Sequence, residues 1–257
     1  MSVQIARGRF VWSDLMTTDP QAAQAFYTKV APWGTQAWEG PMPYTMWTAG
    51  PGPVGGVMQL PPGGAQPHWL SYISTPDCDA TARQAADLGG KIVLPPQDIP
   101  TVGRFTVLTD PQGAYFSAFT PAYETPDEDP EPVPGQFSWY ELATTDAAGA
   151  IAFYSKLFGW KETSAFDMGG GWMYHMYGRG GRDLGGIFTK PAEMPGPPAW
   201  CSYIMVDDVN AAAERVKANG GQIFNGPMEV PGGDLIAQGF DPQGAMFAVH
   251  GKVRSAG

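Results

Sequence analysis

Two carboxylates occupy equivalent places beside tryptophans. Asp14 follows Trp12 by two residues and Glu141 follows Trp139 by two, and residues two apart share one face of a strand. An aromatic surround removes solvent from a carboxylate and raises its pKa, as a general base or an acceptor for a ligand donor requires. The alternative is a structural hydrogen bond from each carboxylate to a neighbouring strand or helix end. Asp14 and Glu141 are therefore candidate catalytic residues.

Histidine is scarce, and the three histidines His68, His175 and His250 form no pair at a spacing typical of metal ligands. Imidazole exchanges a proton near neutral pH, so His68 is a third catalytic candidate. A lone histidine can equally be a hydrogen-bonded structural residue, and the same alternative applies to His250. The glycine-rich stretches lack the Lys-Ser/Thr pair of a phosphate-binding loop, which argues against nucleotide binding.

The tryptophan and carboxylate pairs recur because the chain is a tandem duplication. Residues 8–30 and 135–157 are identical at 12 of 23 positions, with an offset of 127. The register continues with Tyr44 on Tyr174 at an offset of 130. Near the end of each copy, the Asp-Pro-Gln-Gly motif that begins at Asp110 aligns with the motif that begins at Asp241, at an offset of 131. We expect a first domain over 1–120 and a second over 136–257.

The segment 121–135 between the copies is rich in proline and acidic residues. Its prolines stiffen the backbone, its carboxylates repel one another, and it has almost nothing to bury. It is therefore predicted to be a solvated linker, with a docking motif for a partner as the alternative.

Each copy is predicted to alternate strands with short helices. An Asp19 N-cap followed by proline begins a helix over 21–30, and Gly-Gly ends a second helix over 79–88. Strands are expected at 10–16, 44–49, 54–60, 69–74, 91–94, 105–110 and 115–119. This order fits an α+β fold with largely antiparallel sheets.

The composition excludes several classes of function. The net charge of −10 leaves no cationic surface for a nucleic acid backbone. No apolar run is long enough to cross a bilayer, and the first ten residues have no core of signal-peptide length. Two cysteines cannot form a disulfide framework. We expect a cytoplasmic protein without nucleic acid or membrane partners.

The repeated Thr-Thr-Asp, Phe-Tyr, Gly-Gly and Asp-Pro-Gln-Gly motifs resemble those of the vicinal oxygen chelate superfamily. This superfamily contains glyoxalase I, bleomycin-resistance proteins and extradiol dioxygenases. The resemblance covers nearly everything except the linker and the termini. It implies two βαβββ modules in each domain, paired around a cup-shaped cavity, and it leaves the chemistry open because one fold hosts many functions.

In metal-dependent members of the superfamily, His, Gln or Glu ligands come from the first and last strands of paired modules. Carried over by position, these ligand positions fall on residues that are poor donors for a divalent metal. They are Trp12, Trp139, Ser117 and Ala248, with His68 or Ala199 at a further position and Met58 and Phe188 near the remaining one. We therefore expect no stoichiometric metal and no cofactor; a shifted register that recruits Asp14, Glu141 or His175 is the alternative.

Aromatic and polar side chains are expected to line the cups instead, as in small-molecule pockets. The candidate ligand-binding residues are Trp12, Asp14, His68, Tyr72, Tyr115, Ser117, Trp139, Glu141, Tyr203 and His250.

Three functions remain open. The first is metal-independent binding of a small, partly aromatic or planar organic molecule, similar to the bleomycin-resistance branch. The second is a glyoxalase-like lyase or isomerase, or a dioxygenase, with an atypical site. The third is an interaction protein with one vestigial cavity, since His68 meets Ala199 in the second copy. Both a monomer and a homodimer are compatible with four modules in one chain.

Overall fold

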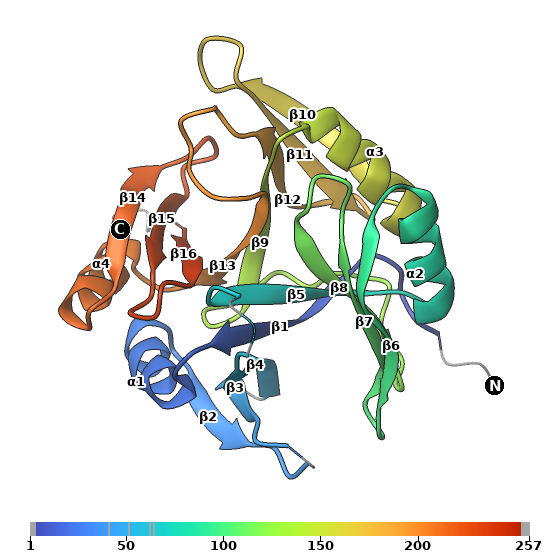
Figure 1. Ribbon diagram of the computed structural model, residues 1–257. Helices are drawn as coiled ribbons and strands as arrows, with labels where there is room; N and C mark the ends of the chain where they lie inside the picture. Colours follow the sequence, from blue (N-terminus) through green and yellow to red (C-terminus); the bar gives the residue numbers. More distant parts are fainter. Residues whose placement is uncertain (1–3, 41, 51, 62, 64, 253–257) are drawn as a thin grey trace. The chain divides into compact units, whose positions relative to one another are not determined.

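Each repeat forms an eight-stranded mixed sheet with two helices (Figure 1). The computed structural model describes residues 4–40, 42–50, 52–61, 63 and 65–252. The first sheet has the strand order β2-β3-β4-β1-β5-β8-β7-β6, and the second has the same order, β10-β11-β12-β9-β13-β16-β15-β14. The predicted α+β fold, with two βαβββ modules in each repeat, is confirmed.

The elements of the first repeat are β1 (Phe10–Thr17), α1 (Pro20–Val30), β2 (Gly34–Ala37), β3 (Thr45–Ala49), β4 (Gly52–Gln59), β5 (His68–Ser74), α2 (Cys78–Asp87), β6 (Lys91–Ile99), β7 (Gly103–Thr109) and β8 (Tyr115–Pro121). Those of the second are β9 (Phe137–Thr144), α3 (Ala147–Phe158), β10 (Lys161–Asp167), β11 (Met173–Arg179), β12 (Arg182–Thr189), β13 (Ala199–Met205), α4 (Val209–Ala218), β14 (Gln222–Glu229), β15 (Leu235–Phe240) and β16 (Met246–Gly251). None of the helices within the described residues is both long and apolar enough to span a membrane.

The local signals for the helices and strands are mostly confirmed. Asp19 caps α1, and its side chain accepts a hydrogen bond from the backbone N–H of Ala22 at 3.0 Å. The strand β2 was not expected, because its four exposed residues Gly-Thr-Gln-Ala carry no apolar alternation. The strand β6 continues to Ile99 instead of ending near Leu94.

The chain divides into two compact units, and each unit combines parts of both repeats. Unit 1 comprises residues 1–11, 70–130 and 140–200, and unit 2 comprises residues 12–69, 131–139 and 201–257. The domain boundaries expected from the sequence follow the repeats and stay a prediction.

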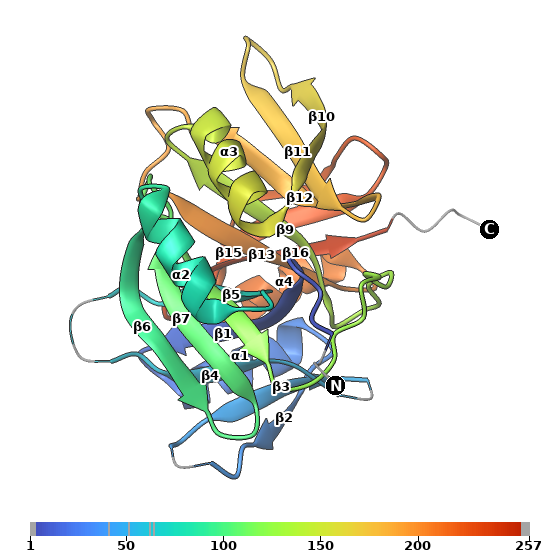
Figure 2. The ribbon, with the colours of Figure 1, turned by 90° about the vertical axis from the view of Figure 1, so that its right-hand side faces the viewer.

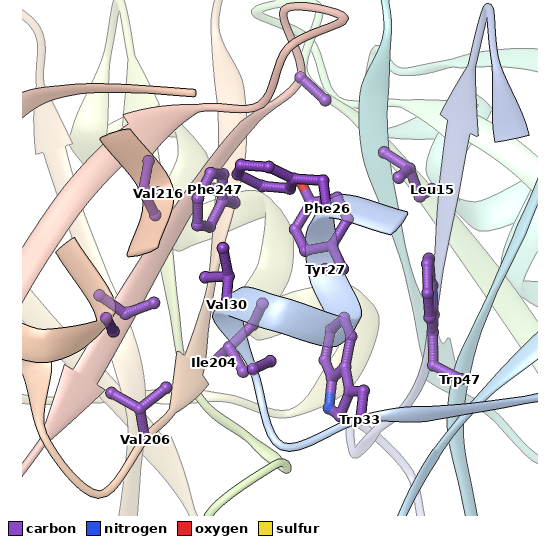
Figure 3. Packing of buried hydrophobic residues seen from close by; sticks show 14 of the residues in the cluster. Leu15, Phe26, Tyr27, Val30, Trp33, Trp47, Ile204, Val206, Val216 and Phe247 are labelled. Carbon is purple, nitrogen blue, oxygen red and sulfur yellow. The ribbon is translucent and has the colours of Figure 1, made fainter. Parts of the chain in front are cut away.

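The core of unit 2 is made by α1 and α4 with the strands that flank them (Figure 3). Phe26 and Tyr27 of α1 contact Phe247 of β16, with ring centroids 5.8 and 5.3 Å away. Val30 and Trp33 lie in the same cluster as Ile204, Val206 and Val216. Residues from both repeats therefore share one core.

Unit 1 is built in the same way around α2 and α3, which lie side by side (Figure 2). Phe116 of β8 contacts Phe153, Tyr154 and Phe158 of α3, with centroids 5.4–6.1 Å apart. Phe10 stacks on Tyr140 at 3.6 Å. The first repeat thus contributes rings to a core that the second repeat completes.

A buried chain of hydrogen bonds joins the two repeats within each unit. In unit 2, Trp69 Nε1 donates to the Tyr27 hydroxyl at 3.1 Å, and this hydroxyl donates to Asp241 Oδ2 at 3.2 Å. In unit 1, Trp200 donates to Tyr154 at 3.1 Å, and Tyr154 donates to Asp110 at 3.1 Å. These chains use the tyrosine of the repeated Phe-Tyr motif and the aspartate of the repeated Asp-Pro-Gln-Gly motif.

The aspartates of these chains also form the Asp-Pro-Gln-Gly turns. Asp110 Oδ1 accepts from the backbone N–H groups of Gln112 and Ala114 at 3.0 and 2.8 Å. Burial raises the pKa of Asp110 and of Asp241, and the hydrogen bonds they accept oppose that rise. Burial and the adjacent carboxylate raise the pKa of Tyr27 and Tyr154 well above the usual range, so both phenols stay protonated.

The acidic linker is mostly exposed where it lies in unit 1, but ion pairs hold it there. Asp129 accepts from Arg9 Nε at 2.7 Å and from Arg179 Nη1 at 2.6 Å, while Asp127 pairs with Arg179 at 2.5 Å. The side chains of Asp129 and Arg179 are only 13% and 10% exposed. The expectation of a solvated connector is therefore wrong at Asp129, where arginines outside the linker neutralise the carboxylate, while most other linker residues in unit 1 are exposed.

We expect Tyr154→Phe to destabilise the protein by about 1–3 kcal/mol near neutral pH, because it removes a donor from the buried Asp110 carboxylate. The loss of that hydrogen bond raises the folded-state pKa of Asp110 further above the unfolded value of about 4. A carboxyl group whose pKa is raised in the folded state stabilises the folded protein at low pH. This contribution is lost as the pH rises through the folded-state pKa. The difference in unfolding free energy between the variant and the unmodified protein, measured by urea unfolding, should therefore be smallest below about pH 4 and grow toward pH 7.

The matched control is Tyr123→Phe, which alters a tyrosine that is 52% exposed. Its unfolding free energy should stay within about 0.5 kcal/mol of that of the unmodified protein. Equal stability of the two variants at pH 7 would contradict a structural role for the buried chain.

Candidate functional site

Asp14 is the centre of a compact polar cluster in unit 2. Its side chain is buried, at 5% exposed, and its Oδ1 accepts from Trp12 Nε1 at 2.9 Å and from the Tyr44 hydroxyl at 2.5 Å. Trp12 Nε1 also donates to the Tyr44 hydroxyl oxygen at 2.7 Å. The sequence placed Trp12 and Asp14 on one face, and their side chains are indeed in contact. We call Trp12, Asp14 and Tyr44 the Asp14 cluster.

Gly56 makes room for this cluster. The strands β1 and β4 are parallel neighbours, and Asp14 lies opposite Gly56 in their register. A Cβ at position 56 would overlap the Tyr44 hydroxyl and lie 2.8 Å from Asp14 Oδ1. In the second repeat, a Cβ at Gly186 would overlap the Tyr174 ring. Gly56 and Gly186 occupy equivalent positions in the two repeats, and the absence of a side chain there lets a tyrosine approach the carboxylate in each repeat.

Tyr44 acts as a hydrogen-bond donor and not as a base. Burial first, and the Asp14 charge second, raise its pKa far above the usual range. The phenol thus stays protonated at physiological pH. Tyr44 directs its proton to Asp14, so the cluster presents a fixed polar group beside an indole and a phenol ring.

The second repeat has a related arrangement in unit 1. The Tyr174 hydroxyl donates to Glu141 Oε2 at 2.9 Å, and Glu141 is half-buried. The Tyr174 ring stacks on Phe188 at 6.0 Å, and Trp172 meets Phe188 edge-on at 5.4 Å. Trp172 is 37% exposed. Together they form an aromatic row, Trp172–Phe188–Tyr174, that leads from the surface to the Glu141 carboxylate.

The other candidate residues of the first repeat are divided between the two units. His68 belongs to unit 2, and its Nδ1 lies 2.8 Å from the carbonyl oxygen of Gln66. Tyr72 and Ser117 are buried register partners of β5 and β8 in unit 1, and Ser117 donates to the Thr106 carbonyl at 2.9 Å. Tyr115 is 49% exposed. Their ligand-binding roles stay predictions.

Trp139 and Tyr203 of the second repeat come together in unit 2. They belong to one small cluster with Cys201 and Ala248. The Tyr203 hydroxyl accepts from Gln238 Nε2 at 2.7 Å. His250 lies on β16 between two polar partners, Ser138 and Asp234.

Sequence reasoning missed Tyr44, Tyr174 and Gln238 as site residues. The signal for the tyrosines was available, since Tyr44 and Tyr174 align between the copies as the Gly-Gly pairs do. Gln238 aligns with Val107 and gave no such signal.

The residues present do not fit the metal centre of the metal-dependent members. Among the described residues, no group of three or more His, Cys, Asp or Glu side chains is arranged to hold an ion. The indole of Trp12 donates its N–H to Asp14 and offers no lone pair, and Ala248 has no donor atom. Ser117 directs its hydroxyl to a backbone carbonyl.

The comparisons with known proteins agree with this architecture. The family model described as Glyoxalase/Bleomycin resistance protein/Dioxygenase superfamily matches residues 9–117 and 136–249. The chain is 34% identical over 255 residues to "Putative glyoxylase CFP32" of Mycobacterium tuberculosis, covering 93% of this chain and 92% of the relative. It is 29% identical over 269 residues to "Anthracycline biosynthesis protein DauV" of Streptomyces sp., covering 96% and 94%.

Two solved structures share the fold at low identity. The Mn(II)-bound glyoxalase from Novosphingobium aromaticivorans has a TM-score of 0.65 at 19% identity, covering 98% of this chain and 83% of the other. A homoprotocatechuate 2,3-dioxygenase variant from B. fuscum has a TM-score of 0.68 at 13% identity, covering 97% and 72%.

We expect Gly56→Ala to displace Tyr44 from Asp14 and to cost about 1–3 kcal/mol of stability, because the new methyl group overlaps the phenol. Gly52→Ala is the matched control on the same strand, since a Cβ there meets nothing within 4 Å. Chemical unfolding of both variants tests this expectation. Similar losses for the two variants would contradict the close approach at position 56.

We also expect the protein to retain no stoichiometric Ni, Zn, Mn or Fe(II) after loading and desalting, because the donor set does not suit these ions. Elemental analysis measures this directly. An ion near one per chain that survives chelator treatment would overturn our assignment of the ligand positions and point to Asp14, Glu141 and the histidines.

Proposed function

Because the chain belongs to the glyoxalase/bleomycin resistance/dioxygenase superfamily, we propose that it binds a small organic molecule with a planar aromatic part. The binding groups would be the Asp14 cluster of the first repeat and the Glu141–Tyr174 pair of the second. The other candidates from the sequence, His68, Tyr72, Tyr115, Ser117, Trp139, Tyr203 and His250, would contribute to the same binding surfaces.

The observation that carries this proposal is the pairing of a carboxylate with a tyrosine hydroxyl beside exposed or half-buried rings in both repeats. Aromatic faces stack on planar ligands, and a few fixed polar groups give the orientation. In the first repeat, Asp14 holds both the indole of Trp12 and the phenol of Tyr44, so these rings are positioned before a ligand arrives. Preorganisation of this kind lowers the entropic cost of binding.

The names of the relatives support a ligand of this type. Two curated relatives are named for anthracycline biosynthesis, at 29% and 28% identity. Anthracyclines have planar fused rings that match an aromatic surface. Another relative is named a glyoxylase, which supports an enzymatic alternative, a glyoxalase-like lyase or isomerase. Tyr44 stays protonated and so cannot serve as the base of such a reaction.

Fluorescence titration with an anthracycline, doxorubicin, tests the proposal, since the chain has nine tryptophans that can report binding. We expect Asp14→Asn to weaken binding by about tenfold, the equivalent of about 1.4 kcal/mol, because the neutral amide oxygen is a weaker acceptor than the carboxylate for the two hydrogen bonds that Oδ1 accepts. Asp98→Asn is the control, as this carboxylate is an exposed partner of Arg104 in unit 1.

An unchanged affinity in Asp14→Asn would return Asp14 to a purely structural role. Absence of saturable binding to the unmodified protein would contradict a ligand of the anthracycline type. Turnover of the glutathione adduct of methylglyoxal by the purified protein would favour the glyoxalase alternative instead.

A further inference from the structure

Ser138, His250 and Asp234 form a continuous hydrogen-bonded chain in unit 2. Ser138 Oγ lies 2.8 Å from His250 Nδ1, and His250 Nε2 lies 2.9 Å from Asp234 Oδ2. The three residues come from separate elements: Ser138 from β9, His250 from β16, and Asp234 from the residue before β15. The His250 and Asp234 side chains are 14% and 34% exposed, and Ser138 is half-buried, so solvent reaches the group.

The contact with Asp234 assigns a hydrogen to one nitrogen of the imidazole. The Asp234 carboxylate only accepts, so Nε2 carries a hydrogen and Nδ1 of the neutral ring is an acceptor. Ser138 also lies 3.3 Å from the Tyr203 carbonyl, but its shorter contact is to Nδ1. The serine hydroxyl therefore faces a base that a carboxylate orients, which is the arrangement of an activated nucleophile.

The first repeat shows that the fold does not require these residues. By the repeat alignment, Ser138, His250 and Asp234 correspond to Val11, Phe119 and Gly103, none of which has a polar side chain. Both repeats nevertheless form sheets with the same strand order. Three positions on separate elements thus carry polar residues in the second repeat and none in the first. Together these polar residues form one connected hydrogen-bonded chain.

We propose that Ser138 is a nucleophile for carboxylic esters, with His250 as its general base and Asp234 as the residue that orients His250. Ser138 Oγ bonds to the ester carbonyl carbon while its proton passes to His250 Nδ1. The bond from that carbon to the alcohol oxygen then breaks, and the alcohol leaves with the proton from Nδ1. Water, deprotonated by the same nitrogen, releases the carboxylic acid and restores Ser138. His250 appears in both proposals, but this activity requires neither the Asp14 cluster nor the Glu141–Tyr174 pair.

The test uses para-nitrophenyl acetate with the full-length protein. We expect a burst of nitrophenolate close to one per chain, followed by slower turnover, with the acetyl group located on Ser138 by peptide mass spectrometry. Removal of the nucleophile or of its base should lower the burst rate by at least about 100-fold. The variants Ser138→Val and His250→Phe introduce the residues of the first repeat, and Ser138→Ala is a smaller change for use if Val disturbs folding.

Ser164→Ala is the control, since Ser164 is an exposed residue of β10 in unit 1 and should leave the burst unchanged. Circular dichroism and the unfolding midpoint verify that each variant is folded. An acetyl group on other residues only, or equal acetylation of Ser138 in folded His250→Phe, would overturn the proposal. Acetylation of Ser138 that depends on His250 and also falls in Asp234→Asn would support it.

Discussion

The rest of the structure depends on the buried hydrogen-bond chain from tryptophan through tyrosine to aspartate. In each unit the tryptophan and the tyrosine come from one repeat and the aspartate from the other, as in Trp69–Tyr27–Asp241. The aspartate simultaneously closes the turn before the last strand of its own repeat. A buried carboxylate without these donors would be costly, so the turn, the helix that carries the tyrosine and the strand that carries the tryptophan must form together.

This constraint explains how the candidate binding groups come to be held in place. Tyr27 and Trp47 lie in one aromatic core, with centroids 5.7 Å apart, and Trp47 is on β3 beside the strand β4 that carries Gly56. The parallel pairing of β1 with β4 then sets Asp14 opposite Gly56, where Tyr44 can reach it. Positions that serve packing are matched between the repeats, whereas the positions of the Ser138 chain are not. The two repeats therefore share one frame and differ in the polar groups that it carries.

Much of the fold could be predicted from the sequence, because the Asp19 cap, the Gly-Gly helix ends and the Asp-Pro-Gln-Gly turns are local signals repeated in register. The site was only partly predictable. Alternation along β1 placed Trp12 beside Asp14, but Tyr44 reaches them from the residue before β3. The contacts of Ser138 with His250 and of Asp129 with Arg179 join residues 112 and 50 positions apart. No periodicity or local composition encodes such contacts, and the same limit explains why the linker was expected to be solvated.

The central claim is that the Asp14 cluster presents its rings to a planar ligand. A crystal structure of the protein with doxorubicin bound tests it most directly. The account predicts density for the fused rings against Trp12 or Tyr44, with both side chains still hydrogen-bonded to Asp14. Ligand density that touches neither Trp12 nor Tyr44 would contradict it.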